Sequence, residues 1–223
     1  MRKLLTTIIS ALAIVLILDS VAGEAKIGTQ GKNISLDTWI SPREISSKFP
    51  YYISGFDNEN RPIFVIEMGK WDLRTTIEAG GKDLEDLELH ILQLFYRMEQ
   101  AGKYFRNGEE QGAEDVAIIT DWEDYSLLQL ASSPTVQFFL KHMAGFQRIQ
   151  EQISYGFFVN ANSVASTLIN LARPIMGSVM ERIEVHGTQK SRWIPRLLRK
   201  FRTSQIPPWY GGQEKFSPIA IYG

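Results

Sequence analysis

The sequence predicts an α/β domain in which helices cover a mixed, mostly parallel sheet. Short apolar segments alternate along the chain with longer segments whose apolar residues recur every three or four positions. This alternation is the order of strands and helices in a domain with a largely parallel sheet. The short segments also lack regular apolar–polar alternation, as expected for strands whose two faces are both covered. The chain of 223 residues is long enough for one such domain.

The first elements of the domain are predicted from helix and turn signals. Residues 37–49 contain Ser41–Glu44, where a serine followed by a proline is typical of the start of a short helix. Residues 55–62 hold glycine, asparagine and proline, and they are predicted to form a turn before an apolar strand at 63–68. A long helix is predicted over residues 83–106, because its apolar residues fall on one stripe.

The remaining elements continue the alternation of strands and helices. Three apolar segments are predicted to be strands, and a helical segment follows each of them. In chain order, the predictions are a strand at 116–119, a helix at 132–153, a strand at 157–160, a helix at 164–183, a strand at 183–186 and a basic helix at 190–202.

The composition and the motif content argue against an enzyme. The chain has no cysteine, which excludes disulfides, thiolate metal sites and cysteine nucleophiles. None of the three histidines, His90, His142 and His186, has a partner at metal-ligand spacing, so each is predicted to be structural or on the surface. Glycine-rich phosphate loops and the serine-nucleophile motif are also missing from the sequence. We therefore expect no metal, no cofactor and no catalytic residue.

One acidic cluster is the best alternative for catalysis. Asp121, Glu123 and Asp124 follow the predicted strand at 116–119, and α/β enzymes often place their sites after a strand. A hydrolase that uses Asp121 is therefore a third-ranked hypothesis. The alternative is that Asp121 caps a turn while the other two carboxylates face water.

The first 23 residues have the pattern of a secretory signal peptide. Arg2 and Lys3 precede the apolar segment Leu4–Leu18, and the small residues Val21 and Gly23 follow it. The apolar segment is shorter than the roughly 20 residues of a membrane-spanning helix. A short membrane anchor and a wrongly assigned first exon are the alternatives. This segment favours the secretory pathway, whereas the lack of cysteine suits a reducing compartment. Residues 24–36 are predicted to be a loose leader.

The predicted helix at 164–183 carries two neighbouring apolar stripes, although packing on a sheet needs one. Pro174 removes a backbone donor, and Gly177 weakens the next turn. Such a helix is suited to be a movable wall that contacts the sheet in one state and a lipid in another. The alternative is a helix buried permanently inside the domain.

The predicted helix at 190–202 is basic. Its cations are Lys190, Arg192, Arg196, Arg199, Lys200 and Arg202. A basic amphipathic helix can lie on an anionic membrane surface, where each cation contributes roughly 1 kcal/mol. The alternative is a solvated helix whose charge is balanced by acids elsewhere, for example at 83–88. No nucleic-acid partner is expected, because no basic segment is interleaved with aromatic residues.

Several segments together resemble the CRAL-TRIO lipid-binding domain family, which includes phosphatidylinositol- and tocopherol-transfer proteins. The resemblance covers residues 37–223. Its segments are Gly55–Ile63, Gly69–Leu73, Ile118–Ser126, Phe157–Ala161, Asn170–Pro174, Arg182–Gly187 and Ile206–Gly212. Each segment alone is weakly specific, but their order and spacing make a fairly specific match.

The resemblance implies a deep apolar cavity above the sheet, closed by a mobile gate helix that falls on residues 164–183. It implies binding and transfer of one hydrophobic molecule of the phospholipid, tocopherol or retinoid class, transient membrane contact, and a cytoplasmic location. It also places a phospholipid headgroup at Glu151 and Arg182, for which a surface ion pair is the alternative. The lipid-binding residues implied are Ile118, Phe138, Phe139, Phe157, Val159, Leu168, Leu171, Ile175 and Val179.

The chain departs from the family pattern at both ends. Family members carry a helical subdomain before the fold, where this sequence has the signal-like segment and the leader. Residues 217–223 resemble the segment that leads into a β-rich GOLD domain in one subgroup. We expect a monomer. The alternative function is a docking module that attaches to membranes or proteins through residues 190–202 without exchanging lipid.

Overall fold

The computed structural model of this protein describes residues 35–105 and 113–222. The signal-like segment at 1–23 and nearly all of the predicted leader at 24–36 lie outside the described residues. Among the helices that are described, none has the length and apolar character needed to cross a membrane.

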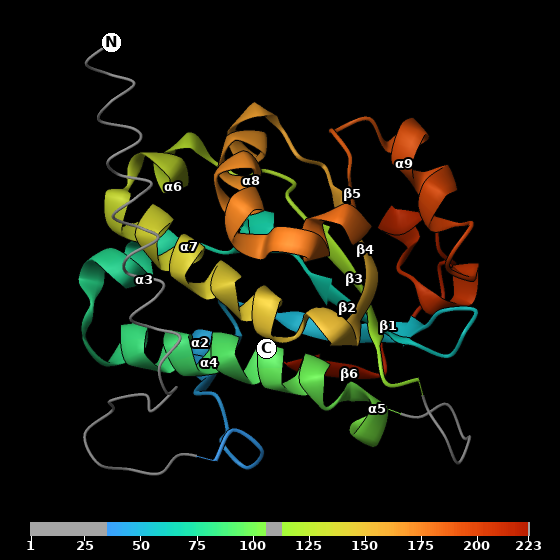
Figure 1. The fold of residues 1–223 in the computed structure, drawn as a ribbon, viewed down its shortest axis with the longest axis horizontal. Helices are drawn as coiled ribbons and strands as arrows, with labels where there is room; N and C mark the ends of the chain where they lie inside the picture. Colours follow the sequence, from blue (N-terminus) through green and yellow to red (C-terminus); the bar gives the residue numbers. More distant parts are fainter. Residues whose placement is uncertain (1–34, 106–112, 223) are drawn as a thin grey trace. The chain divides into compact units, whose positions relative to one another are not determined.

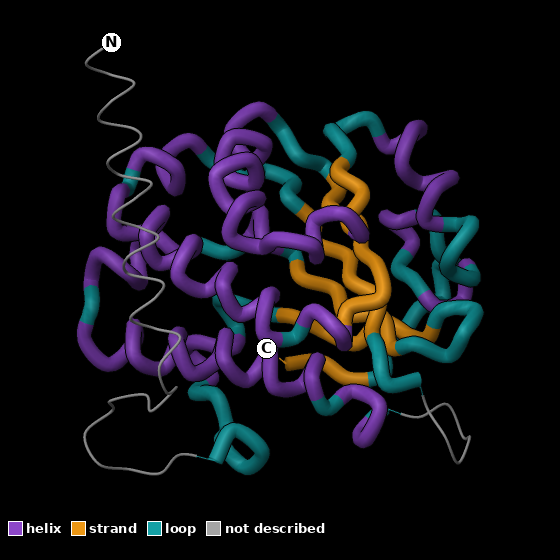
Figure 2. The backbone as a smooth tube through the Cα atoms, in the orientation of Figure 1, coloured by secondary structure: helices purple, strands orange, loops and turns teal. Residues whose placement is uncertain are grey.

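A six-stranded mixed sheet runs through the centre of the domain (Figure 2), in the order β5-β4-β3-β2-β1-β6. The three pairs from β2 to β5 are parallel, whereas β1 is antiparallel to both β2 and β6. This confirms the predicted mixed, mostly parallel sheet. The strands are β1 (Tyr51–Phe56), β2 (Pro62–Ile66), β3 (Val116–Asp121), β4 (Ile153–Val159), β5 (Ile183–Val185) and β6 (Ala220–Tyr222).

Helices cover both faces of the sheet (Figure 1), with α4, α7 and α8 on one side and α9 on the other. The α-helices are α2 (Arg43–Ser46), α3 (Leu73–Ala79), α4 (Gly81–Glu99), α5 (Ala101–Tyr104), α6 (Leu127–Ala131), α7 (Ser133–Arg148), α8 (Ser163–Met176) and α9 (Lys190–Leu197). Short 3-10 helices are η1 (Met68–Lys70), η2 (Gln150–Gln152), η3 (Gly177–Arg182), η4 (Thr203–Gln205) and η5 (Pro208–Tyr210).

Two apolar layers result, because successive residues of a strand point to opposite faces of the sheet. The layer beneath α9 joins strand residues to α9 and to the segment that follows it. Its buried members are Ile63, Val65, Ala117, Ile119, Phe157, Val159, Trp193, Leu197, Phe201, Ile206 and Tyr210. The alternate strand residues, among them Ile66, Thr120 and Phe158, lie on the face toward α4 and α7.

Strand β1 is the main element that the sequence analysis missed. It occupies Tyr51–Phe56, where no strand was predicted and whose last two residues were assigned to the turn at 55–62. The turn is shorter than predicted and is closed by Asp57, whose Oδ1 accepts hydrogen bonds from the backbone N–H groups of Glu59 and Arg61, both at 2.8 Å. A side chain therefore holds the hairpin, and this frees the preceding residues to pair in the sheet.

The predicted helix at 164–183 is also shorter than expected. Helix α8 ends at Met176, because Gly177 has a φ of 58°, in the left-handed region that glycine adopts easily. Residues Gly177–Arg182 form the 3-10 helix η3, and Ile183 already belongs to β5. Pro174 lies inside the last turn of α8.

Candidate functional site

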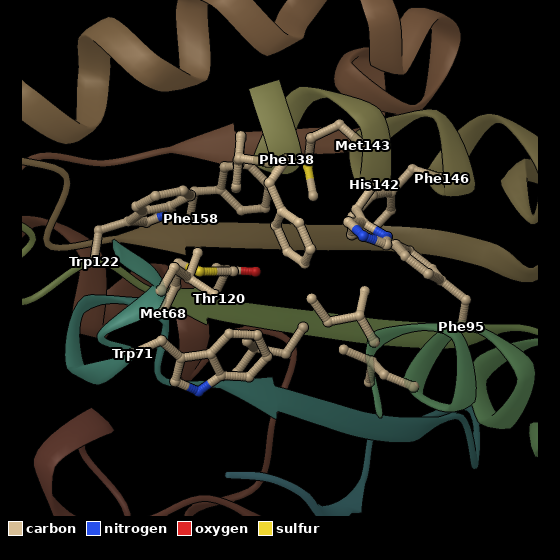
Figure 3. A pocket seen from close by; sticks show the side chains of 15 residues that line it. Met68, Trp71, Phe95, Thr120, Trp122, Phe138, His142, Met143, Phe146 and Phe158 are labelled. Atoms are coloured by element: carbon tan, nitrogen blue, oxygen red, sulfur yellow. The ribbon is translucent and has the colours of Figure 1, made fainter. Parts of the chain in front are cut away.

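A cavity of about 40 Å³ lies between the sheet and helices α3, α4 and α7 (Figure 3). Its floor includes Ile66, Thr120 and Phe158, from three adjacent strands. Its wall is almost entirely apolar and aromatic, and includes five residues of α7: Phe138, Phe139, His142, Met143 and Phe146. Residues three and four apart lie on one face of a helix, so α7 presents this whole set to the sheet.

Besides Trp71, three residues that line the cavity have a polar side-chain atom: Thr120, Trp122 and His142, which are 4%, 1% and 7% exposed. Burial lowers the pKa of His142 to about 3, so its ring is neutral near pH 7. None of the residues that line the cavity is therefore charged near pH 7.

The predicted lipid-binding residues divide into three groups. Phe138 and Phe139 line the cavity, and Ile118 lies on the same face of the sheet because it alternates with the α9-side residues Ala117 and Ile119. Phe157 and Val159 lie on the opposite face, in the layer beneath α9, so they do not line the cavity. Phe158 is the residue of β4 that lines the cavity.

The predicted gate residues lie around α8 rather than on the cavity wall. Leu168, Ile175 and Val179 are buried, whereas Leu171 is 47% exposed. Helix α8 packs beside α7, and none of its residues lines the cavity. Most residues of the two apolar stripes predicted at 164–183 are therefore buried. This agrees with the alternative prediction of a helix buried inside the domain. A mobile gate stays a prediction.

The predicted headgroup residues lie in neighbouring 3-10 helices. Glu151 is exposed in η2, and the Arg182 guanidinium in η3 donates a hydrogen bond to the backbone oxygen of Ile153 at 2.6 Å. The hydroxyl of Ser178 donates to the side-chain oxygen of Gln150 at 2.8 Å, which joins the two segments. Within the described chain no ion pair joins these two residues, and their role as headgroup contacts stays a prediction.

Asp121 has a structural position. Its carboxylate accepts hydrogen bonds from the side chains of Asn160 and Tyr210, both at 2.8 Å, and from the backbone N–H of Glu123 at 2.9 Å. Burial raises the pKa of this carboxyl group. These bonds tie the ends of β3 and β4 to η5, and the turn-capping role suggested by the sequence is confirmed. No cluster of three or more potential metal ligands occurs in the described residues.

The basic residues at 190–202 differ in their contacts. Lys190 pairs with Glu123 at 3.0 Å, Lys200 lies 4.9 Å from the ring centre of Tyr155, and Arg202 contacts Asn58. The acids at 83–88 do not balance this helix, because Asp86 pairs with Lys82 and Glu88 with Lys141. No carboxylate within the described ranges pairs with the three remaining cations, which are Arg192, Arg196 and Arg199.

Comparison with known proteins agrees with this geometry. The CRAL/TRIO domain matches residues 46–212. The fold is similar to a crystal structure of Sfh5, with a TM-score of 0.55 and 10% sequence identity. The matched region covers 80% of this chain and 58% of the Sfh5 chain. The chain thus spans less than two thirds of that structure, and the likeness shows the fold alone. No curated protein matches the sequence.

Proposed function

The chain belongs to the CRAL/TRIO domain family of lipid-binding modules, and we propose from this premise that it holds one hydrophobic molecule between its sheet and helices α4 and α7. The observation that carries the proposal is the apolar cavity above β2, β3 and β4. Burial of each methylene group of a ligand there would contribute about 0.8 kcal/mol. The function needs no covalent step.

A lipid requires more space than about 40 Å³, so binding must open this region. Helix α8 is the proposed moving element. Its last turn contains Pro174, which lacks a backbone donor, and it ends at Gly177, where the chain changes direction. Outward movement of α8 and η3 would let α7 follow, and would bring Leu168, Ile175 and Val179 to the wall of an enlarged cavity. Leu171, which is already exposed, would guide lipid into it.

Lipid uptake tests this proposal. Delipidated protein is titrated with fluorescent phospholipid, tocopherol and retinoid analogues, and native mass spectrometry identifies any co-purified lipid. We expect uptake at one molecule per chain. The variant Leu94→Phe places a larger side chain on the cavity wall, so it should lower affinity at least tenfold while leaving the unfolding midpoint unchanged or slightly raised.

Leu198→Phe is the matched control, because it makes the same change at a side chain that is 39% exposed on the α9 side of the domain. This variant should bind as the unmodified protein does. Equal loss of affinity in both variants, or no uptake of any analogue, would contradict the proposed site.

A second candidate function is docking on an anionic membrane through α9. Arg192 and Arg196 are exposed on α9, Arg199 is exposed in the turn that follows it, and Trp193 and Leu197 of the same helix are buried. Trp209, next to the buried Tyr210, is 49% exposed, and indole rings favour the membrane–water interface. This surface and the cavity lie on opposite faces of the sheet, so docking through α9 would leave the cavity side free.

Vesicle binding tests the second function. Replacement of all three arginines by glutamine should weaken binding to phosphatidylserine-containing vesicles about 100-fold at low salt, at roughly 1 kcal/mol for each cation. The control replaces Lys70, Lys82 and Lys141, each of which is paired with an acid, and removes the same formal charge. If both triple variants weaken vesicle binding equally, the loss follows from net charge alone, and α9 is not the docking surface.

A further inference from the structure

We propose that a lipid enters the cavity through the seam between α4 and α7, and that α7 and α8 move away from α4 together when this seam opens. Phe95 on α4 and Phe146 on α7 are the residues that close the seam. This entrance rests on the proposed function, because it leads to the same cavity.

The seam extends from the cavity wall to the surface of the protein. Helices α4 and α7 lie side by side (Figure 1), and each contributes residues to the wall. On the outside, the Lys141 ammonium of α7 lies 2.8 Å from the Glu88 carboxylate of α4. Their side chains are 56% and 30% exposed, so this ion pair lies at the surface and contributes little to holding the two helices together.

An aromatic pair closes the inner side of the seam. Phe95 and Phe146 both line the cavity and are 2% and 4% exposed. Their rings meet edge to face with the centroids 5.0 Å apart, and Figure 3 shows both side chains at the same end of the cavity. Within the described residues no backbone hydrogen bond joins α4 to α7, so the seam can open without breaking one.

Gly145 lets the two helices approach closely beside this pair. A Cβ atom at Gly145 would lie 2.8 Å from Cε2 of Phe95 and 3.0 Å from its Cδ2. The Phe95 ring therefore lies directly against the backbone of α7, and no side chain at position 145 interlocks with it. A flat ring can leave such a surface without displacing other side chains, so this contact is suited to a seam that opens and closes.

Helix α7 is attached more firmly on its other side. It packs more extensively against α8 than against α4. Just beyond the ends of α7 and α8, the Ser178 hydroxyl donates a hydrogen bond to the side-chain oxygen of Gln150 at 2.8 Å. The outward movement of α8 proposed above would therefore carry α7 with it, and the gap would form between α7 and α4.

The start of α7 is held in place. The hydroxyl of Ser132, directly before α7, donates a hydrogen bond to the Glu78 carboxylate of α3 at 2.7 Å. Separation from α4 would therefore be smallest near Ser132 and largest toward the other end of α7, where Phe95 and Phe146 meet. A cross-link in the middle of α7, at Lys141, would prevent this movement.

Reversible cross-links test the entrance, because the chain has no cysteine and introduced pairs react selectively. Glu88→Cys with Lys141→Cys, joined by a short bifunctional methanethiosulfonate, holds α4 to α7. Gln150→Cys with Ser178→Cys, joined by the same reagent, holds α7 to α8 and is the matched control. Stopped-flow fluorescence follows uptake of the fluorescent phospholipid, tocopherol and retinoid analogues by delipidated full-length protein, before and after the cross-link is reduced.

We expect the cross-link between α4 and α7 to slow uptake at least tenfold, and reduction to restore it. The cross-link between α7 and α8 should change the rate less than twofold. If it slows uptake as much as the first cross-link does, or more, α8 parts from α7 and the proposed entrance is wrong. No uptake of any analogue by the reduced proteins contradicts the proposed function itself, whereas uptake that neither cross-link changes contradicts the entrance alone.

Gly145→Ala tests the seam without a cross-link. The added methyl group pushes the Phe95 ring away from α7, so uptake should be at least threefold faster than in the unmodified protein. Gly187→Ala is the matched control, because it adds a methyl group at a residue that does not line the cavity and should leave the rate unchanged. Equal uptake rates in the two variants would overturn the role of Phe95 in closing the seam.

Discussion

Gly69→Ala should destabilise the domain by about 3 kcal/mol, because an added methyl group has no space at this position. A Cβ atom there would lie 1.7 Å from the backbone oxygen of Glu123 and 2.8 Å from the backbone carbon of Trp122. Both obstacles are main-chain atoms, so the two loops would have to separate. Urea unfolding followed by tryptophan fluorescence measures the loss of free energy of unfolding.

The matched control is Gly187→Ala, whose added Cβ would meet only the backbone oxygen of Ala161, at 3.8 Å. The backbone at Gly187 is not in the left-handed region, so alanine there should be neutral or stabilise by up to about 1 kcal/mol. Similar stability losses in the two variants would show that the loops after β2 and β3 are not in close contact. Those loops carry Met68, Trp71 and Trp122, so the same substitution should also distort the cavity wall.

Periodicity predicted most of the sheet and the long helices, because these elements bury whole stripes of apolar residues. The helices α4, α7 and α9 and the strands β2, β3, β4 and β5 were all located, but the three helices were predicted five to seven residues too long at their C-terminal ends. Strand β1 was missed because Pro50 and Gly55 indicate breaks locally, whereas pairing with β2 and β6 supplies the stabilisation. Such long-range pairing leaves no trace in a local window of sequence.

The candidate site was predicted less well than the fold. Phe157 and Val159 were chosen from β4 because three apolar residues in succession do not reveal which face each one occupies. Phe157 and Val159 pack against α9, and only the packed fold shows that α9 covers their face of the sheet. Phe138 and Phe139, which the family resemblance implied, do line the cavity, on the face of α7 that lies against the sheet.

The polar residues of the cavity could not be singled out from the sequence. Thr120 lies inside an apolar strand, and His142 was interpreted as structural or surface-exposed because no other histidine is nearby in sequence. His142 is buried, but its position on the cavity wall depends on how α7 lies above the sheet. Which side chains line a cavity is decided by the packed fold, and no local sequence pattern shows it.

Mild acid should destabilise the protein well before its carboxylates are protonated. Burial lowers the pKa of His142 to about 3 and that of His90 to about 4, from 6.5 in an unfolded chain. Below pH 6.5 the unfolded chain therefore binds protons that the folded protein does not, so stability is full above pH 6.5 and is lost as the pH falls. For two histidines, the loss between pH 7 and 4.5 is about 5 kcal/mol.

Other titrating groups act outside this window or in the opposite direction. The pKa values of Asp72 and Glu78 are lowered from 3.8 and 4.5, by hydrogen bonds from Thr75 and Ser132 first of all, so these carboxylates cost stability only at lower pH. The raised pKa of Asp121 favours the folded state as the pH falls and opposes the trend. Near His142 and His90, the cations Lys141 and Arg97 add to the penalty on protonation.

Chemical unfolding at a series of pH values between 7 and 4.5 checks this prediction. His142→Leu should remove about half of the pH dependence, because one of the two buried histidines remains. Met143→Leu is the matched control: it changes the adjacent residue of the same cavity wall at nearly constant volume but removes no titrating group. A pH dependence that is equal in the two variants would place the acid sensitivity elsewhere. It would also remove the basis for a neutral, buried His142 on the cavity wall.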